Sequence, residues 1–119
     1  MHNIFVWNLD ETPIELAAIE RAFHSVPEFE DVRYGEPGGA LIEACYVEPE
    51  SHTFVRLRGD RSAVSLSGTS DTALRAAMIL QQHSKIPLRI VDEEYSFDLI
   101  LKDFPDFESL VNAIEKARR

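Results

Sequence analysis

The chain has 119 residues, of which 45% are hydrophobic and 28% are charged, and it carries a formal net charge of -9 at pH 7. This length suits one hydrophobic core, so we expect a single domain over residues 1–119, and the composition excludes a disordered chain. The negative charge disfavours direct binding to nucleic acids or anionic membranes, and it favours binding to basic proteins.

The apolar runs and the cysteine content indicate the cellular compartment in which the protein is expected. No apolar run approaches the roughly 20 residues that a membrane helix requires, and the N-terminal residues lack the pattern of a signal peptide. Cys45 is the only cysteine, which excludes an intrachain disulfide and zinc sites built from several cysteines. We therefore expect a cytoplasmic protein.

The first predicted elements are a strand and a helix. Residues 4–9, IFVWNL, predict a strand inside a sheet, because both alternating sets of side chains are mostly apolar. A helix is predicted to follow, with Thr12 as its cap, Pro13 in its first turn and Glu15 at the capping-box spacing. Its apolar stripe ends before Pro27.

Two hairpins are predicted in the middle of the chain. Residues 28–35 and 40–48 are expected to pair around a reversal that uses Gly38 and Gly39. In the second of these strands, one face is predicted to carry Ile42, Ala44 and Tyr46 and the other Leu41, Glu43, Cys45 and Val47. HTFVRLR and SAVSLS, within residues 52–67, form the second predicted hairpin, and its first strand has a partly cationic face.

The last third of the chain predicts a central helix, two strands and a terminal helix. The central helix, within residues 68–84, is expected to be capped by Thr69 or Ser70 and to pack on more than one side. Strands over 88–91 and 95–101 should follow, the second with Tyr95, Phe97, Leu99 and Leu101 on one face, which is expected to be buried at Leu99. A terminal amphipathic helix should begin at Pro105 or Asp106. The order β-α-β-β-β-β-α-β-β-α predicts an α+β fold, with a single mixed or antiparallel sheet packed with about three helices.

Catalytic, cofactor and metal sites are not predicted. His24 and His83 lie near the ends of predicted helices, and no nucleophile-elbow or zinc-helix motif accompanies a histidine. Cys45 lies in the middle of a predicted strand, which favours a small buried residue over a nucleophile. SGTSD at residues 67–71 lacks the lysine and the longer glycine loop of a phosphate-binding P-loop.

An acidic turn between the last two predicted strands is the first candidate site. It lacks the alternating acids and the glycine of a calcium loop, and three consecutive acids in a turn are expected to be exposed rather than tuned for acid/base catalysis. Two interpretations remain: a solvated hairpin tip, or a surface that binds the lysines and arginines of a partner protein. The predicted contacts are Asp92, Glu93, Glu94, Tyr95 and Asp98, with Tyr95 as a rigid anchor.

A second acidic stretch has the same character and could extend the same surface or lie far from it. Its predicted contact residues are Glu30, Asp31, Tyr34 and Glu36.

The segment GTSDTALRAAMILQQHSKIPLRIVDEEYSFDLILKDFPDFESLVNAIEKA, residues 68–117, resembles the C-terminal half of immunity proteins of bacterial toxin systems, including contact-dependent growth inhibition. The resemblance implies a protein that is not an enzyme and that neutralises a basic toxin domain, often a nuclease. Such an inhibitor either covers the surface that holds the polyanionic substrate or binds away from the active site.

Two other functions stay open. One is a small enzyme or ligand-binding domain with a pocket near Cys45, His52 and Arg56. The other is an interaction module that binds a partner without inhibiting it.

Overall fold

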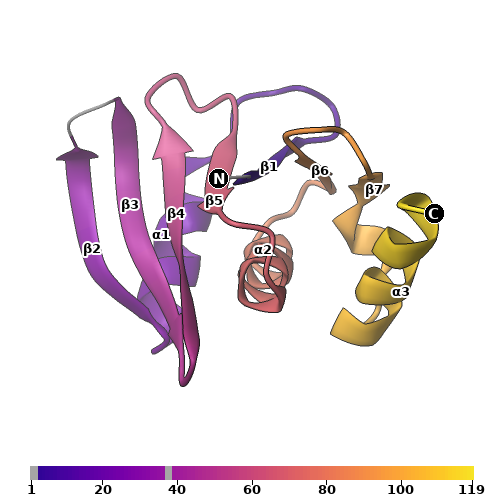
Figure 1. Ribbon diagram of the computed structural model, residues 1–119. Helices are drawn as coiled ribbons and strands as arrows, with labels where there is room; N and C mark the ends of the chain where they lie inside the picture. Colours follow the sequence, from indigo (N-terminus) through magenta and orange to yellow (C-terminus); the bar gives the residue numbers. More distant parts are fainter. Residues whose placement is uncertain (1–2, 37–38) are drawn as a thin grey trace.

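One antiparallel sheet with helices packed on it forms the protein. The computed structural model describes residues 3–36 and 39–119 (Figure 1), and within them seven strands, three α-helices and one 3-10 helix alternate in the predicted order. The predicted α+β fold is confirmed. The elements are β1 (Asn3–Asn8), α1 (Leu16–Ser25), β2 (Phe29–Glu36), β3 (Ala40–Glu48), β4 (Ser51–Arg58), β5 (Val64–Ser67), α2 (Asp71–Gln82), β6 (Leu88–Asp92), β7 (Asp98–Ile100), the 3-10 helix η1 (Leu101–Asp103) and α3 (Phe107–Ala117).

The strands are arranged in the spatial order β2-β3-β4-β5-β1-β6-β7. β1 therefore lies inside the sheet, as predicted, with β5 on one side and β6 on the other. Its Ile4 and Val6 are fully buried, whereas Phe5 and Trp7 on its other face are only half-buried. The expectation that β1 is covered on both faces is thus wrong for one of them.

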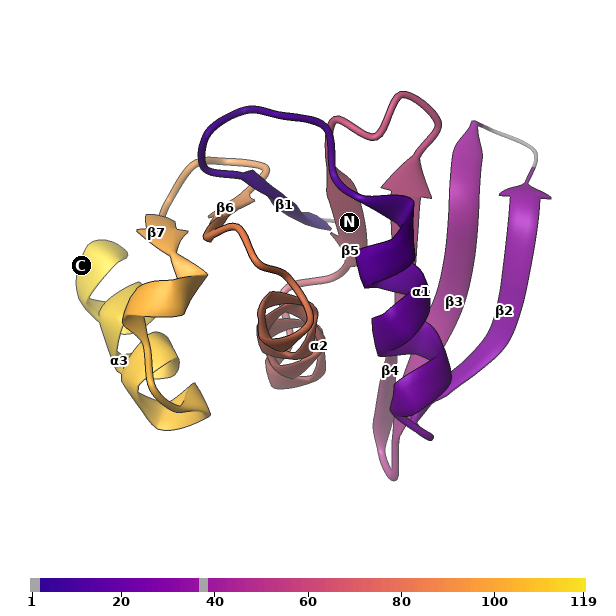
Figure 2. The same cartoon turned by 180° about the vertical axis from the view of Figure 1, so that it is seen from behind.

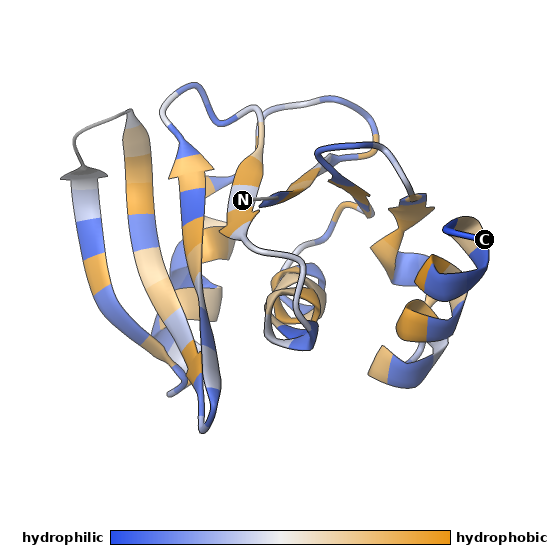
Figure 3. Cartoon of the chain, viewed as in Figure 1, coloured by the Kyte–Doolittle hydropathy of each residue, from blue (hydrophilic) through white to orange (hydrophobic). Residues whose placement is uncertain are grey.

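The helices cover one face of the sheet. α1 and α2 pack against the strands, and α3 packs beside α2, as Figures 1 and 2 show from opposite sides. In β5 and the second half of β4, apolar and polar residues accordingly alternate (Figure 3), which is the pattern of a sheet that buries one face. In β3 the residues Ile42, Ala44 and Tyr46, which were predicted to share a face, are buried. The opposite face of β2, β3 and β4 is not covered by a helix.

Helix α1 begins later than its sequence predicts. Thr12 does not cap it, because the backbone N–H and the hydroxyl of Thr12 both donate to Asp10 Oδ1, at 3.1 and 2.6 Å. Ile14 N donates to Arg61 O at 2.8 Å, which draws this stretch toward the β4–β5 loop. The local bonds to Asp10 and the tertiary bond to Arg61 hold residues 10–14 in a loop, and the helix starts at Leu16.

The other two helices begin where the sequence predicts: α2 follows its predicted cap Ser70, and α3 follows Asp106, one of its two predicted starts. Ser70 Oγ accepts a hydrogen bond from Ala73 N at 3.4 Å, and Asp106 Oδ1 accepts one from Ser109 N at 2.8 Å. Both bonds satisfy a backbone donor that the helix itself leaves unpaired. α2 contacts strands on one side and both other helices, so its prediction as the central helix is confirmed.

The strand predicted over residues 95–101 is shorter than expected. β7 spans only Asp98–Ile100, and the chain then enters η1. Tyr95 has a positive φ of 52° in the preceding turn and is 63% exposed, so it does not share the buried face of Phe97.

None of the helices in residues 3–36 and 39–119 is long and apolar enough to cross a membrane.

Candidate functional site

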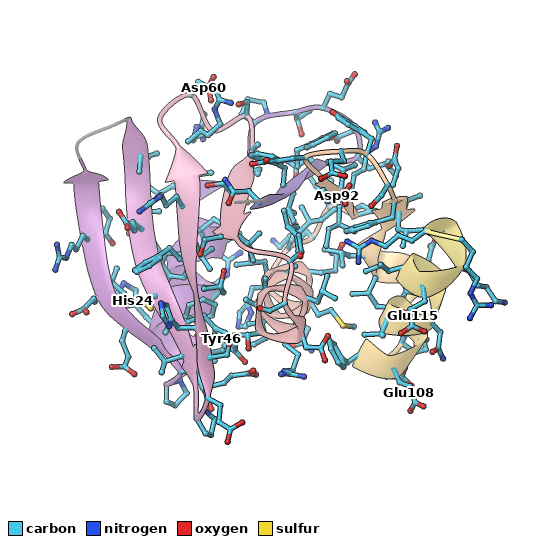
Figure 4. All side chains as sticks on the ribbon, viewed as in Figure 1. His24, Tyr46, Asp60, Asp92, Glu108 and Glu115 are labelled. Carbon is cyan, nitrogen blue, oxygen red and sulfur yellow. The ribbon has the colours of Figure 1, made fainter. Side chains whose placement is uncertain are left out.

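The two predicted acidic surfaces lie near opposite edges of the sheet. Glu30 and Asp31 belong to the edge strand β2, whereas Asp92 and Asp98 belong to β6 and β7. Five inter-strand steps separate β2 from β6, which is roughly 24 Å along the sheet at ordinary strand spacing. Asp92 accordingly lies on the β6–β7 side of the molecule in Figure 4, away from the β2 edge. The two stretches therefore form separate surfaces.

Asp92 is a structural residue rather than an exposed contact. It is only 5% exposed, and its carboxylate accepts hydrogen bonds from Ser96 N at 2.7 Å and from the Ser96 hydroxyl. Arg118 Nη2 lies 3.4 Å from Asp92 Oδ2. Burial acts to raise the pKa of Asp92, but the hydrogen bonds from Ser96 and Arg118 outweigh it and lower the pKa. The expectation that all three consecutive acids of this turn are exposed is wrong for Asp92.

Asp98 has a charge partner within the protein as well. Its carboxylate accepts hydrogen bonds from Nε and Nη2 of Arg89, with Arg89 Nε 2.7 Å from Asp98 Oδ1. These hydrogen bonds lower the pKa of Asp98. The tip of the turn consists of Glu93, Glu94 and Tyr95, which are exposed. The fixed charge that this turn offers to a partner is therefore smaller than its four carboxylates suggest.

The second acidic stretch divides between the two faces of the sheet. Tyr34 lies on the helix side, where its hydroxyl donates to Glu20 Oε2 of α1 at 2.6 Å. Glu30 pairs across the strands with Cys45, whose side chain is on the uncovered face. The predicted contact Glu36 has a side chain outside the described part of the structure. Only Glu30 and Asp31 are thus placed together on one surface.

A groove of about 630 Å³ lies beside these two acids, over β2, β3 and β4 on the uncovered face. Its lining consists of Asp31, Arg33, Glu43, Cys45, Val47, Glu48, Pro49, Glu50, Ser51, His52 and Phe54. Cys45, Val47 and Phe54 supply apolar surface, and Phe54 is 39% exposed. We call this feature the sheet-face groove. It combines an exposed aromatic ring with charged neighbours, as protein interfaces commonly do.

Carboxylates outnumber basic groups around the sheet-face groove. Glu43 forms an ion pair with Arg56 at 3.1 Å, and Glu48 binds Arg75. Asp31 and Glu50 have no ion-pair partner among the described residues, and they leave the rim negative beside the single arginine of the lining, Arg33. Its charge is therefore complementary to that of a basic ligand.

Cys45 and His52, two of the three residues of the predicted enzyme or ligand pocket, line the sheet-face groove. Burial and then the charges of Glu30, Asp31 and Glu43 raise the pKa of the Cys45 thiol, so the thiolate needed for nucleophilic attack is disfavoured. The His52 ring meets the edge of Phe54, with ring centroids 5.4 Å apart. These contacts favour a binding surface over a thiol-based active site.

Arg56, the third residue of that predicted pocket, lies over the Phe54 ring, with its guanidinium carbon 5.6 Å from the ring centroid.

Within residues 3–36 and 39–119, no group of three or more His, Cys, Asp or Glu side chains is arranged to hold a metal ion.

Three groove residues, Glu43, Glu50 and Phe54, were not predicted as contacts. Strand alternation placed Glu43 on the same face as Cys45, and Phe54 on the face opposite Val55. The alternation does not show which strands lie next to one another.

Comparison of the chain with models of protein families, with curated proteins and with solved structures gave no significant match.

Proposed function

We propose that this protein binds a basic protein partner through the sheet-face groove, and that the partner is a toxin domain that it neutralises. The observation that carries the proposal is the combination of an exposed Phe54 on an apolar floor with a negative rim, on the one face of the sheet without a covering helix. Hydrophobic contact provides affinity at such a site, and charge provides orientation.

The charge of the whole chain supports the same partner. A formal charge of -9 attracts a cationic protein over distances of about one Debye length, roughly 8 Å at physiological salt, and so speeds its association. A nuclease domain has a basic substrate-binding surface because it must hold a polyanion. Covering that surface would exclude the nucleic acid, and this requires no chemical step by the inhibitor. The resemblance of residues 68–117 to bacterial immunity proteins agrees with this role.

The sheet-face groove is a better contact surface than the β6–β7 turn. At that turn Asp92 is buried and Asp98 is paired with Arg89. At the groove, Asp31 and Glu50 project at the rim without an ion-pair partner among the described residues, and Phe54 lies between them and the centre of the sheet. A partner lysine or arginine can therefore approach the rim without first displacing an arginine of this protein.

The test is a binding measurement with the protein encoded by the adjacent gene. We expect a complex whose association slows as salt rises, and whose formation abolishes the toxic activity of that protein. Asp31→Asn with Glu50→Gln should slow association, and Phe54→Ala should raise Kd by about tenfold or more, chiefly through faster dissociation.

Two further double variants remove the same number of charges elsewhere on the protein. Glu108→Gln with Glu115→Gln changes the same number of charges on α3 (Figure 4), and binding should stay near that of the unmodified protein. Glu93→Gln with Glu94→Gln tests the β6–β7 turn. If the turn variant weakens binding while the groove variants do not, the interface is the turn and the groove proposal is wrong. A partner that is bound but keeps its activity would indicate an interaction module without inhibition.

A further inference from the structure

A second hollow, distinct from the sheet-face groove, lies on the helix side of the sheet. It has a volume of about 230 Å³ and opens where α1 and β1 meet the connection from α2 to β6. Its walls are mainly aliphatic, with Val6, Ile14, Ile19, Val64, Leu80 and Leu88 among them. We call it the α1 cavity. Protein interiors contain few voids much larger than a water molecule, so a hollow of this size in the core is a candidate ligand site.

The volume and the lining residues of the α1 cavity indicate the size and the apolar character of the ligand. An engineered apolar cavity of about 150 Å³ binds benzene, so this larger one can hold a molecule of roughly six to eight carbon atoms. No aromatic side chain and no arginine belongs to its lining. The surface that a ligand would meet is therefore that of branched aliphatic side chains, which match a saturated hydrocarbon chain.

Asn8 supplies one polar group in the lining. It is only 3% exposed, and its side-chain nitrogen donates to Thr12 O at 3.0 Å and to Pro13 O at 3.1 Å. Because both partners are carbonyl groups, the amide orientation is determined and its oxygen points elsewhere. That oxygen accepts no hydrogen bond from the described residues, yet no fully buried side-chain oxygen among them lacks a partner. This oxygen therefore keeps some accessible surface, and Asn8 is one of the residues that line the α1 cavity.

The two charged residues of the lining carry opposite charges. Glu15 and Lys85, one acid and one base, are both exposed and mark the side on which the α1 cavity opens to solvent. A carboxylate ligand would meet Glu15, and an ammonium ligand would meet Lys85. Neither sign of charge is selected, and a neutral ligand is favoured over both.

We infer that the α1 cavity binds a small neutral aliphatic alcohol of about six to eight carbons, with its hydroxyl donating to Asn8 Oδ1. The aliphatic walls take the chain, and the oxygen of the buried Asn8 takes the single donor of the ligand. This site is independent of the proposed binding of a basic protein, because it uses neither the groove residues nor the uncovered face of the sheet.

The test is a titration of the full chain with 1-hexanol, followed by methyl resonances in two-dimensional NMR spectra. The methyl groups of Val6, Ile19, Val64 and Leu80 should shift in a saturable manner. Ile114, which is buried in α3 and is not part of the lining, serves as an internal reference and should not shift. Absence of shifts up to the solubility limit of the alcohol, or equal shifts throughout the core, would overturn the inference.

A pair of adjacent alanines provides matched variants. Ala18 is buried in the lining and Ala17 is exposed on the same helix. Ala18→Leu should fill the α1 cavity and weaken hexanol binding by about tenfold or more, whereas Ala17→Leu should leave it unchanged. Should Ala18→Leu fail to fold, Ile86→Phe at the half-buried edge of the lining is expected to weaken binding in the same way. Unchanged binding in a folded filling variant would contradict the site.

Hexanoate and hexylamine test the role of the head group. Both carry the same chain as hexanol, and both should bind more weakly because each meets a like charge and neither is favoured by the lining as a whole. If hexanoate or hexylamine binds more tightly than hexanol, the assignment of a neutral alcohol is wrong.

Discussion

Arg118, at the end of α3, reaches the buried carboxylate of Asp92 at the end of β6, with 3.4 Å between Arg118 Nη2 and Asp92 Oδ2. Its Nε also donates to Ser96 Oγ at 3.1 Å, and its guanidinium carbon lies 5.3 Å from the centroid of the Phe97 ring. One side chain thus connects the C-terminal helix to the β6–β7 turn.

Arg118→Ala is expected to destabilise the protein by about 1 to 2 kcal/mol, because Asp92 loses a charged donor while remaining buried. The adjacent variant Arg119→Ala removes an exposed cation from the same helix end and should change the free energy of unfolding by less than about 0.5 kcal/mol. Urea denaturation of both variants measures the difference. Equal effects would mean that the contact with Asp92 contributes no net stability.

Glu48 should make stability depend on acid pH. Hydrogen bonds from Arg75, at 2.6 Å to each of its carboxylate oxygens, and from Thr72 at 2.7 Å lower its pKa from 4.5 to about 2. A carboxyl whose pKa is depressed by folding contributes stability above its unfolded pKa and loses it as the pH falls through the folded value. The contribution should therefore be complete above pH 4.5 and disappear toward pH 2.

Glu48→Gln tests this dependence. At pH 7 it should lower the free energy of unfolding by about 2 kcal/mol, a value discounted because Arg75 is partly exposed to solvent. Between pH 4.5 and 2 the variant should lose less stability than the unmodified protein does. Glu50→Gln, two residues away and exposed, is the control and should have little effect on either measurement. Identical pH profiles for Glu48→Gln and the unmodified protein would contradict the prediction.

Leu101 and Leu99 should differ in their contribution to the core. The sequence predicted that both lie on the buried face of one strand, but Leu101 is 1% exposed at the start of η1 and Leu99 is only partly buried in β7. Leu101→Ala should cost about 2 to 5 kcal/mol through the cavity that it leaves, and Leu99→Ala about half as much. Thermal or urea unfolding of the two variants provides the comparison, and a larger loss for Leu99→Ala would reverse the assignment.

Gly59 marks a close approach between two turns. A Cβ atom at this position would lie 2.7 Å from the backbone oxygen of Gly39, and a backbone atom cannot move aside as a flexible side chain can. Gly59→Ala should therefore destabilise the protein by about 1 to 3 kcal/mol. At Gly35, where φ is 64° and no atom lies within 4 Å, alanine meets only backbone strain of about 1 kcal/mol. Unfolding measurements should rank Gly59→Ala as the more damaging variant.

Local sequence patterns predicted most of the fold. Alternation grouped Ile42, Ala44 and Tyr46 of β3 on one face. The predicted starts of α2 and α3 were correct because Ser70 and Asp106 each bond a donor only three residues away. Thr12 was predicted as a cap on the same reasoning and is not one. Its hydroxyl is taken by Asp10, and Arg61, from a distant part of the chain, holds the intervening segment in a loop.

The candidate site was predictable only in part. Glu30 and Asp31 were selected for their charge. The structure adds Glu43 from β3, Phe54 from β4 and Glu50 from the turn between these two strands. Strand alternation indicates that Phe54 points away from the core, but the sequence contains no local signal for the strand that lies beside it. The groove exists because β2, β3 and β4 are neighbours in the sheet.

The amino-acid sequence by itself determined the order of the elements, the residues of β3 that share a face and the negative charge, since these depend on side-chain type and on periods of two to four residues. Only the tertiary structure decided which acids keep their charge available. Asp92 and Arg118 are 26 residues apart in the chain, and Glu48 and Arg75 are 27 apart, so each pair meets only after folding. A carboxylate becomes part of the core or part of a binding surface according to the cation that folding brings within a few ångströms of it.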